Sequence, residues 1–339
     1  MNKRERFEAF LQNKPVDYVP SGIFHHYMPS QEWMAGTKER RSFEKLVAGQ
    51  LVTKRKTDPD ICKIMNDVLM IMPIDVSMVK EPKDLKYVVP PAMDSVYVSR
   101  TLELTERVLA FYADEDIPSF VTSFAPIFSL RHRLEEEDPM HRDLMGELFA
   151  ADPQAAYDGM RTVAERTMEI HQKLFDTFPL DGIYFSVNNQ NSVLTDELYR
   201  EIAAPIEKEM IADINKRGLT FMHICGTRGQ TNNLDLYTDY DFAAVNWAVY
   251  SENTSLKEGK ELFGGKPVMG GFAQTGLIYD GTEEEIKAEV RRILNETGQL
   301  GVMLGADCTV PMDIDEQHFV WVREACQAYA EDHRGESAV

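Results

Sequence analysis

Residues 182–226 read GIYFSVNNQNSVLTDELYREIAAPIEKEMIADINKRGLTFMHICG, and this stretch decides the fold class. It begins with a short apolar run, Gly182–Val187, and ends with another, Thr220–Gly226, and both have the length and composition of buried strands. Between them, Thr195–Arg217 is an amphipathic segment in which Thr195 precedes two acidic residues, as is typical of a helix N-terminus. A strand, a helix and a strand in this order predict a parallel βαβ unit.

The same alternation recurs along the whole chain. We expect eight strands, at Val19–Phe24, Ile61–Asp67, Phe120–Pro126, Gly182–Val187, Thr220–Gly226, Ala243–Ala248, Pro267–Ala273 and Gly301–Asp307. Between most of them lie amphipathic segments with a helical pattern, such as Pro153–Phe178, Thr282–Thr297 and Asp315–Ala330. Eight strand–helix units favour an α/β fold of the (β/α)8 TIM-barrel type, closed on itself. The alternative, a doubly wound open sheet, loses support because no G-x-G-x-x-G follows the first strand.

Two long segments between these elements, Met28–Val52 and Met78–Val98, are expected to be irregular, polar loops. Loops of this length are commonly functional or lid-like. The first of them follows the first strand, so in a barrel it would cover the C-terminal mouth, where active sites lie. No linker or low-complexity run divides the chain, and we therefore expect a single domain over residues 1–339.

The composition limits the class of partner and the compartment. The 339 residues include 56 acidic and 36 basic side chains, for a formal net charge of −20. This excess of negative charge argues against nucleic acid or an anionic membrane surface as a partner. Four cysteines are too few for a disulfide framework, no apolar run approaches the ~18 residues of a membrane span, and no export signal is recognisable. We therefore expect a cytoplasmic protein.

The strongest chemical signal is the sequence FMHICG at residues 221–226. Residues two apart on a strand point to the same side, so His223 and Cys225 would project together. They lie at the C-terminal end of the fifth expected strand, the end at which barrel enzymes place their active sites. An imidazole and a thiolate side by side are half of a zinc site, and catalytic zinc sites use three protein ligands.

A third ligand is expected at the end of another strand, and Cys308 follows the eighth. Its distance along the chain is no obstacle, because all strand ends of a barrel converge. Cys62, at the start of the second strand, and Cys326, on the last helix, are interpreted as structural. The alternative for each ligand taken alone is a small buried cysteine or a hydrogen-bonded histidine, and the prediction depends on all three falling at strand ends.

Other polar side chains at strand ends could orient a small ligand. We select as candidate substrate-binding residues Asp67, His25, Asn188 and Gln274. The alternative is that they cap the helices that follow the strands.

Several motifs resemble the uroporphyrinogen decarboxylase superfamily over nearly the whole chain. They are Arg4–Phe7 through Pro15–Pro20, then Gly270–Phe272 with Gly281, and Leu304-Gly305 ahead of Cys308 and Pro311. In the decarboxylase branch, the resemblance implies an arginine-rich loop after the first strand and a substrate-binding aspartate. Asp67 is similar to that aspartate, but Phe24–Pro29 contains no arginine, and a substrate bearing many carboxylates would require such cations.

The other branch contains zinc methyltransferases that work with corrinoid proteins, and its His-x-Cys…Cys signature resembles His223, Cys225 and Cys308. The resemblance implies these three residues as catalytic Zn²⁺ ligands and a methyl group moved between a corrinoid and a small thiol or methylated substrate. Family members can add a glutamate near the sixth strand, but residues 245–249 contain none, and Glu252 is a loose candidate. The chain lacks a cobalamin-binding Asp-x-His-x-x-Gly, so a separate corrinoid protein would be the partner.

Three functions remain open from the sequence. The first is this zinc-dependent, corrinoid-dependent methyltransferase, acting on a small-molecule methyl donor, such as a methyl ether, or on a thiol acceptor. The second is a metal-free decarboxylase of the uroporphyrinogen type, favoured by Asp67. The third is a non-catalytic barrel that binds a tetrapyrrole or corrinoid, a role in which metal-ligating residues have no evident use.

Overall fold

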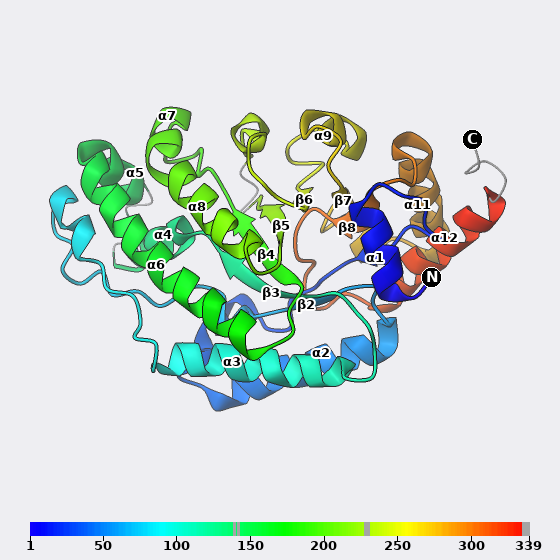
Figure 1. The fold of residues 1–339 in the computed structure, drawn as a ribbon, viewed down its shortest axis with the longest axis horizontal. Helices are drawn as coiled ribbons and strands as arrows, with labels where there is room; N and C mark the ends of the chain where they lie inside the picture. Colours follow the sequence, from blue (N-terminus) through cyan, green and yellow to red (C-terminus); the bar gives the residue numbers. More distant parts are fainter. Residues whose placement is uncertain (138–139, 141–142, 227–230, 334–339) are drawn as a thin grey trace.

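The computed structural model describes residues 1–137, 140, 143–226 and 231–333. Its eight parallel strands curl into a half-barrel that helices surround (Figure 1). The strands are β1 (Ser21–Gly22), β2 (Cys62–Ile64), β3 (Ser119–Phe124), β4 (Gly182–Val187), β5 (Leu219–Ile224), β6 (Ala244–Trp247), β7 (Val268–Phe272) and β8 (Val302–Ala306). This confirms the predicted α/β fold of the TIM-barrel type, and each of the eight expected runs overlaps an observed strand.

The hydrogen-bonded ladder runs in the order β1-β8-β7-β6-β5-β4-β3-β2, so β1 and β2 are its two ends. Both strands are very short, and a side chain rather than a ladder bond connects them. The backbone N–H of Ser21 donates to Oδ2 of Asp60, which lies just before β2, at 3.0 Å. The expected barrel would close by pairing β1 with β2, but no such pairing is present among the described residues. The Asp60 carboxylate links these two strands instead.

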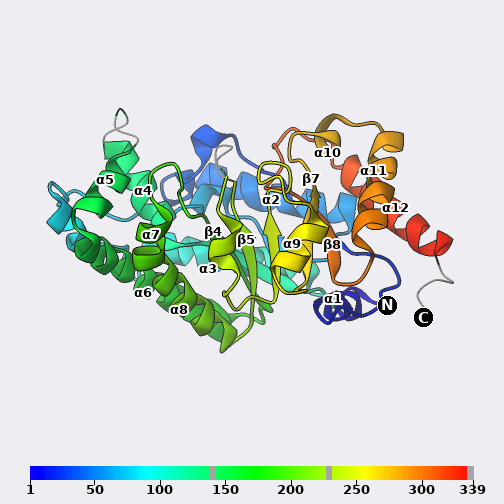
Figure 2. The same cartoon turned by 90° about the horizontal axis from the view of Figure 1, so that it is seen from above.

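Helices follow most of the strands and cover the outer side of the sheet (Figures 1 and 2). They are α1 (Lys3–Leu11), α2 (Arg40–Thr57), α3 (Val96–Leu109), α4 (Pro126–Glu137), α5 (Leu144–Ala151), α6 (Pro153–Thr177), α7 (Asp196–Leu198), α8 (Ala204–Asn215), α9 (Leu256–Leu262), α10 (Leu277–Asp280), α11 (Glu283–Thr297) and α12 (Gln317–Asp332). The expected helix starts at Thr195 and Thr282 are confirmed, because both side chains accept hydrogen bonds from first-turn N–H groups. No helix of the described residues is long and apolar enough to cross a membrane.

The prediction of an irregular loop over Met28–Val52 is wrong in its second half, which belongs to α2. Phe43, Leu46, Val47 and Gln50 are buried along one face of that helix. Their spacing is that of an amphipathic helix, and the many charged residues between them conceal it. The first half is irregular, as expected, apart from two short 3₁₀ turns at Ser30–Glu32 and Ala35–Thr37.

The second expected loop, Met78–Val98, is also partly ordered. It contains a 3₁₀ helix at Pro82–Tyr87, and α3 begins within it at Val96. Three further 3₁₀ segments occur at Asp67–Leu69, Ala110–Tyr112 and Leu234–Tyr237, and a π-helical turn at Tyr199–Ala203 precedes α8.

Helix α1 packs across the N-terminal ends of the strands. Phe7 contacts Phe120 of β3 with ring centroids 5.6 Å apart, and Phe10 contacts Phe221 of β5 at 6.5 Å. These aromatic residues belong to an apolar cluster that fills the interior of the curled sheet. Access to the interior is therefore from the opposite, C-terminal ends of the strands.

Candidate metal centre and its cavity

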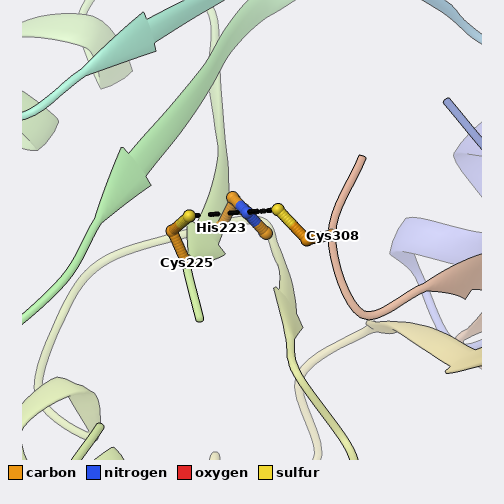
Figure 3. A group of neighbouring side chains, drawn as sticks. All are labelled: His223, Cys225 and Cys308. Carbon is orange, nitrogen blue, oxygen red and sulfur yellow. Dashed lines mark hydrogen bonds between the residues drawn. The ribbon is translucent and has the colours of Figure 1, made fainter. Parts of the chain in front are cut away.

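Three side chains converge at the C-terminal ends of the strands (Figure 3). His223 lies on β5, Cys225 directly follows this strand, and Cys308 lies two residues beyond β8. The Cys225 and Cys308 sulfurs are 3.9 Å apart, and the Cys308 sulfur is 3.5 Å from Nε2 of His223. All three ligand atoms lie within 4.8 Å of one another, so the structure brings together the three residues that the sequence pattern selects.

These separations can be compared with those that zinc requires. Tetrahedral Zn²⁺ with Zn–S bonds of about 2.3 Å and Zn–N bonds of about 2.0–2.1 Å holds its ligands about 3.8 Å apart for two sulfurs and about 3.6 Å apart for sulfur and nitrogen. The separations of 3.9 Å and 3.5 Å match both values. The Cys225 sulfur and Nε2 of His223 lie within 4.8 Å of each other, so the donor types and two of the three separations fit a zinc ion.

The tautomer of His223 follows from the hydrogen bonds of Asn246 on β6. The Asn246 amide nitrogen donates to the carbonyl oxygens of Met269 and Ala306 at 2.9 and 3.1 Å. Its oxygen therefore faces the imidazole and accepts from Nδ1 of His223 at 2.5 Å and from the Tyr184 hydroxyl at 3.1 Å. Nδ1 thus carries the proton, and Nε2 presents its lone pair toward the two cysteines, as a metal ligand must.

The cysteine pair has the electrostatic character of a metal-binding site. The hydrogen bond that the Cys225 thiol makes to Cys308 holds the pKa of Cys308 well below its usual range. The side chains of His223 and Cys225 are buried. A thiolate is the form in which cysteine binds a metal, so the arrangement favours the ligating form of Cys308.

The three residues line a cavity of about 490 Å³ at the C-terminal ends of the strands. Ser30, Trp33 and Met34, from the loop after β1, form part of its wall. The first expected loop therefore does cover the mouth, as predicted. Much of the remaining wall is apolar, and the apolar lining residues are Trp33, Met34, Met65, Met70, Ile71, Phe124 and Phe128.

Two of the four predicted substrate-binding residues, Asp67 and Gln274, line this cavity. The Asp67 carboxylate already has partners, because it accepts from the backbone N–H groups of Tyr27 and Met28 at 2.6 and 3.2 Å. Its other oxygen lies 3.1 Å from Nδ1 of His26. Asp67 therefore holds the loop after β1 in place.

The other two predicted residues lie beside the cavity and not on its wall. His25 points toward Thr53 and Glu316, with Nε2 at 3.1 and 3.2 Å from their oxygens. The Asn188 amide donates to the carbonyl oxygen of Cys225 and accepts from the backbone N–H of Gln190 at 2.7 Å. Asn188 thus holds the backbone of Cys225, one of the three candidate metal ligands. His26, the residue after His25, lines the cavity in place of His25.

Glu252, the loose candidate for a fourth ligand, is engaged elsewhere. Its carboxylate accepts from the backbone N–H and the side-chain amide of Asn232 at distances of 2.7 to 2.9 Å. Asn232 in turn donates to the carbonyl oxygen of Cys225 at 3.2 Å. Among the described residues, the group of converging ligands contains His223 and the two cysteines but no carboxylate.

The sequence pattern did not identify Asn246 or Lys63 as site residues. Asn246 is paired in register with His223 on the adjacent strand, so its position beside the imidazole was recoverable from strand alignment. Lys63 lies between Cys62 and Ile64 in β2. A lysine within an otherwise apolar strand is unusual, and this feature of the sequence could have marked it as a site residue. Lys63 lines the cavity.

Comparisons with known proteins place the fold in a family. A family model described as uroporphyrinogen decarboxylase (URO-D) matches residues 2–329. A methyltransferase from Methanosarcina mazei superposes with a TM-score of 0.73 at 16% sequence identity, covering 97% of this chain and 99% of that chain. A B12-independent methionine synthase from Shewanella sp. W3-18-1, in complex with selenomethionine, has a TM-score of 0.52 at 16% identity and covers 95% of each chain.

No curated protein matches the chain in sequence. At 16% identity, the two solved structures establish a shared fold. The family model extends over nearly the whole chain, from the residues of α1 to those of α12, and the protein therefore belongs to the uroporphyrinogen decarboxylase (URO-D) family.

Proposed function

We propose that the protein is a zinc-dependent methyltransferase that moves a methyl group between a separate corrinoid protein and a small thiol or methylated substrate. The observation that carries this proposal is the convergence of His223, Cys225 and Cys308, whose ligand atoms lie within 4.8 Å of one another. The two separations that involve the Cys308 sulfur match those of a tetrahedral zinc site. The likeness to a structure described as a methyltransferase, over 97% of this chain, is consistent with it.

In this proposal, His223, Cys225 and Cys308 hold one Zn²⁺. The bound ion would supply Lewis acidity to the substrate heteroatom, which deprotonates a thiol or makes a methylated oxygen or sulfur a better leaving group. Two thiolates and one neutral imidazole balance the charge of the ion. Asn246 keeps the imidazole in the tautomer that leaves Nε2 available, and the apolar wall excludes water from the reacting atoms.

The decarboxylase alternative receives less support from the cavity. A tetrapyrrole bearing many carboxylates would require several cations, and the lysines and arginines among the described lining residues are Lys63 and Arg131. Arg131 is bonded to Glu135 at 2.8 Å and to Gln190. The Asp67 carboxylate, on which this alternative depends, holds the loop after β1.

Metal analysis of the purified protein tests the proposal. We expect about one zinc per chain, lost in a His223→Ala/Cys225→Ala double variant and retained in Cys326→Ala, a matched change of a buried cysteine on α12. Zinc-loaded protein should then transfer methyl groups from methylated substrates to cob(I)alamin. A wild-type protein that binds no zinc would overturn the proposal, and tetrapyrrole binding and decarboxylation would then be measured.

A further inference from the structure

Lys63 is a partly buried cation on the wall of the same cavity. It lies on β2, and its ammonium nitrogen is 4.4 Å from the ring centroid of Tyr184 and 4.7 Å from that of Phe24. The two rings contact each other edge-on, with centroids 6.0 Å apart. The ammonium is therefore held against two aromatic rings in a place where its charge faces the cavity.

No hydrogen-bonded or ion-paired anion of the described residues neutralises this charge, and Asp67, Cys225 and Cys308 act on it electrostatically without such a contact. Among the residues that the structure describes, none forms a hydrogen bond or an ion pair with the Lys63 ammonium. The nearby acid Asp67 is occupied by His26 and two backbone N–H groups. Burial lowers the pKa of Lys63 to about 8, and the ammonium form still predominates at neutral pH. A partly buried charge without a hydrogen-bonded partner carries a desolvation cost, and an anionic ligand would offset that cost.

The position of Lys63 relative to the metal site limits the size of such a ligand. The Tyr184 ring that lies under the ammonium also stacks on the imidazole of His223, with centroids 5.6 Å apart and an interplanar angle of 28°. One aromatic ring therefore contacts both the cation and a metal ligand. A molecule with its reactive sulfur or oxygen at the metal site could reach Lys63 with a second group only a few bonds away.

We propose that Lys63 binds an anionic group of the substrate, so that the methyltransferase acts on a small organic acid whose carboxylate, or an anion of similar chemistry, pairs with this ammonium. This inference rests on the proposed function for the identity of the reacting atom, but the anion site itself does not require a metal. The apolar wall contributed by Trp33, Phe124 and Phe128 would contact the hydrocarbon part of the acid.

Paired ligands test the anion site in metal-stripped protein, in which no carboxylate can bind zinc. Calorimetric titrations would compare 3-phenylpropionate with 3-phenylpropan-1-ol, which has a similar hydrocarbon part but no charge. We expect wild-type protein to bind the acid about tenfold or more tightly than the alcohol, the usual scale of a charge-assisted hydrogen bond. Lys63→Met should abolish this preference, because it retains an unbranched apolar side chain but removes the charge.

Lys208→Met is the matched control. Lys208 also lies over a tyrosine ring, that of Tyr240 at 5.2 Å, but it is on α8 and is not among the residues that line the cavity. This variant should keep the preference for the acid. Thermal unfolding of both variants would verify that the fold is retained. Lys63→Met removes a partly buried charge that makes no ion pair or hydrogen bond among the described residues, so it should fold.

The outcomes separate this inference from the proposed function. Equal affinity for acid and alcohol in wild-type protein, or an undiminished preference in Lys63→Met, would overturn the inference even if zinc is bound. Failure of the acid to bind at millimolar concentration would overturn it as well. An acid preference that depends on Lys63, in a protein that takes up no zinc, would support the anion site and reject only the metal-dependent function.

Discussion

The two ends of the barrel both contain buried charged groups, but they use them differently. At the N-terminal end, Arg6 donates to Asp60 at 2.9 Å and to Asp17 at 2.8 Å. The Tyr18 hydroxyl and the Ser21 N–H also donate to Asp60, each at 3.0 Å. At the C-terminal end, the three candidate ligands face one another and a cavity, and the ammonium of Lys63 lies against two aromatic rings without an ion pair among the described residues.

This difference indicates that the charged groups at the N-terminal end stabilise the fold, whereas those at the C-terminal end are available for binding and chemistry. Charges that already have partners within the chain hold elements together, whereas polar groups that face a cavity are available to a ligand. Arg6, Asp17 and Tyr18 belong to the N-terminal motifs that resemble the uroporphyrinogen decarboxylase superfamily. Those motifs therefore identify the fold, and the information about chemistry comes from His223, Cys225 and Cys308.

The largest effect is expected from Cys308→Ala, which removes one ligand from the C-terminal end. Zinc content should fall far below one per chain, and methyl transfer should fall by on the order of 10³-fold or more, because the remaining ligands cannot hold the ion in position. Elemental analysis and a cob(I)alamin methylation assay would measure the two losses. Cys62→Ala, a change of a buried cysteine on β2, should retain both zinc and activity.

A substitution among the charged residues at the N-terminal end should lower stability but leave zinc binding unchanged. Arg6→Met leaves Asp60 buried and without its cation, so the free energy of unfolding should fall by about 3–5 kcal/mol. Denaturant unfolding would measure this loss, and zinc bound per folded chain should remain at the wild-type value. A stable Arg6→Met protein that has lost its zinc would contradict the separation of the two ends.

A buried acid outside both ends provides a reference for the cost of burial alone. Glu207 accepts hydrogen bonds from Tyr199 and Tyr240, and burial raises its pKa from the usual 4.5 to about 7. The folded protein therefore holds a proton that the unfolded chain releases between these values, so stability should fall as pH rises from about 4.5 to 7. The loss should be on the order of 3 kcal/mol at most.

Glu207→Gln should remove this part of the pH dependence, because an amide does not titrate in this range. Urea unfolding of both proteins at several pH values between 4.5 and 7 would measure how steeply the free energy of unfolding depends on pH in each. If the free energy of unfolding changes with pH in the same way in the variant and the wild type, Glu207 remains ionised in the folded protein.

The smallest of these effects is expected from Asn246→Ala, which leaves all three ligands in place. Loss of the amide oxygen removes the acceptor that fixes the tautomer and orientation of His223. Zinc affinity should fall by about 10- to 100-fold, as for other residues that orient metal-ligating histidines. Competition with a chelator of known affinity would measure the change. Asn295→Ala, which removes the acceptor of a hydrogen bond from the Tyr329 hydroxyl between α11 and α12, should leave the zinc affinity unaltered.

Much of the fold could be predicted because it depends on local periodicity. Each expected strand corresponds to an observed strand, and the caps at Thr195 and Thr282 mark helix starts. The ligand set was recoverable because strand ends of a barrel meet at one place. Helix α2 was missed because its buried residues are separated by charged ones, so the apolar pattern is diluted over Arg40–Thr57.

The roles of the other polar residues could not be predicted. The sequence by itself determined the order of strands and helices and which three side chains could ligate a metal, because both follow from spacing along the chain. Only the tertiary structure decided that Asp67 and Asn188 hold backbone segments and that Asn246 orients His223. It also decided that Lys63 faces the cavity without an ion pair among the described residues. The physical reason is that a hydrogen-bonding group is available to a ligand only if no distant segment has already taken it, and those segments meet only in the folded chain.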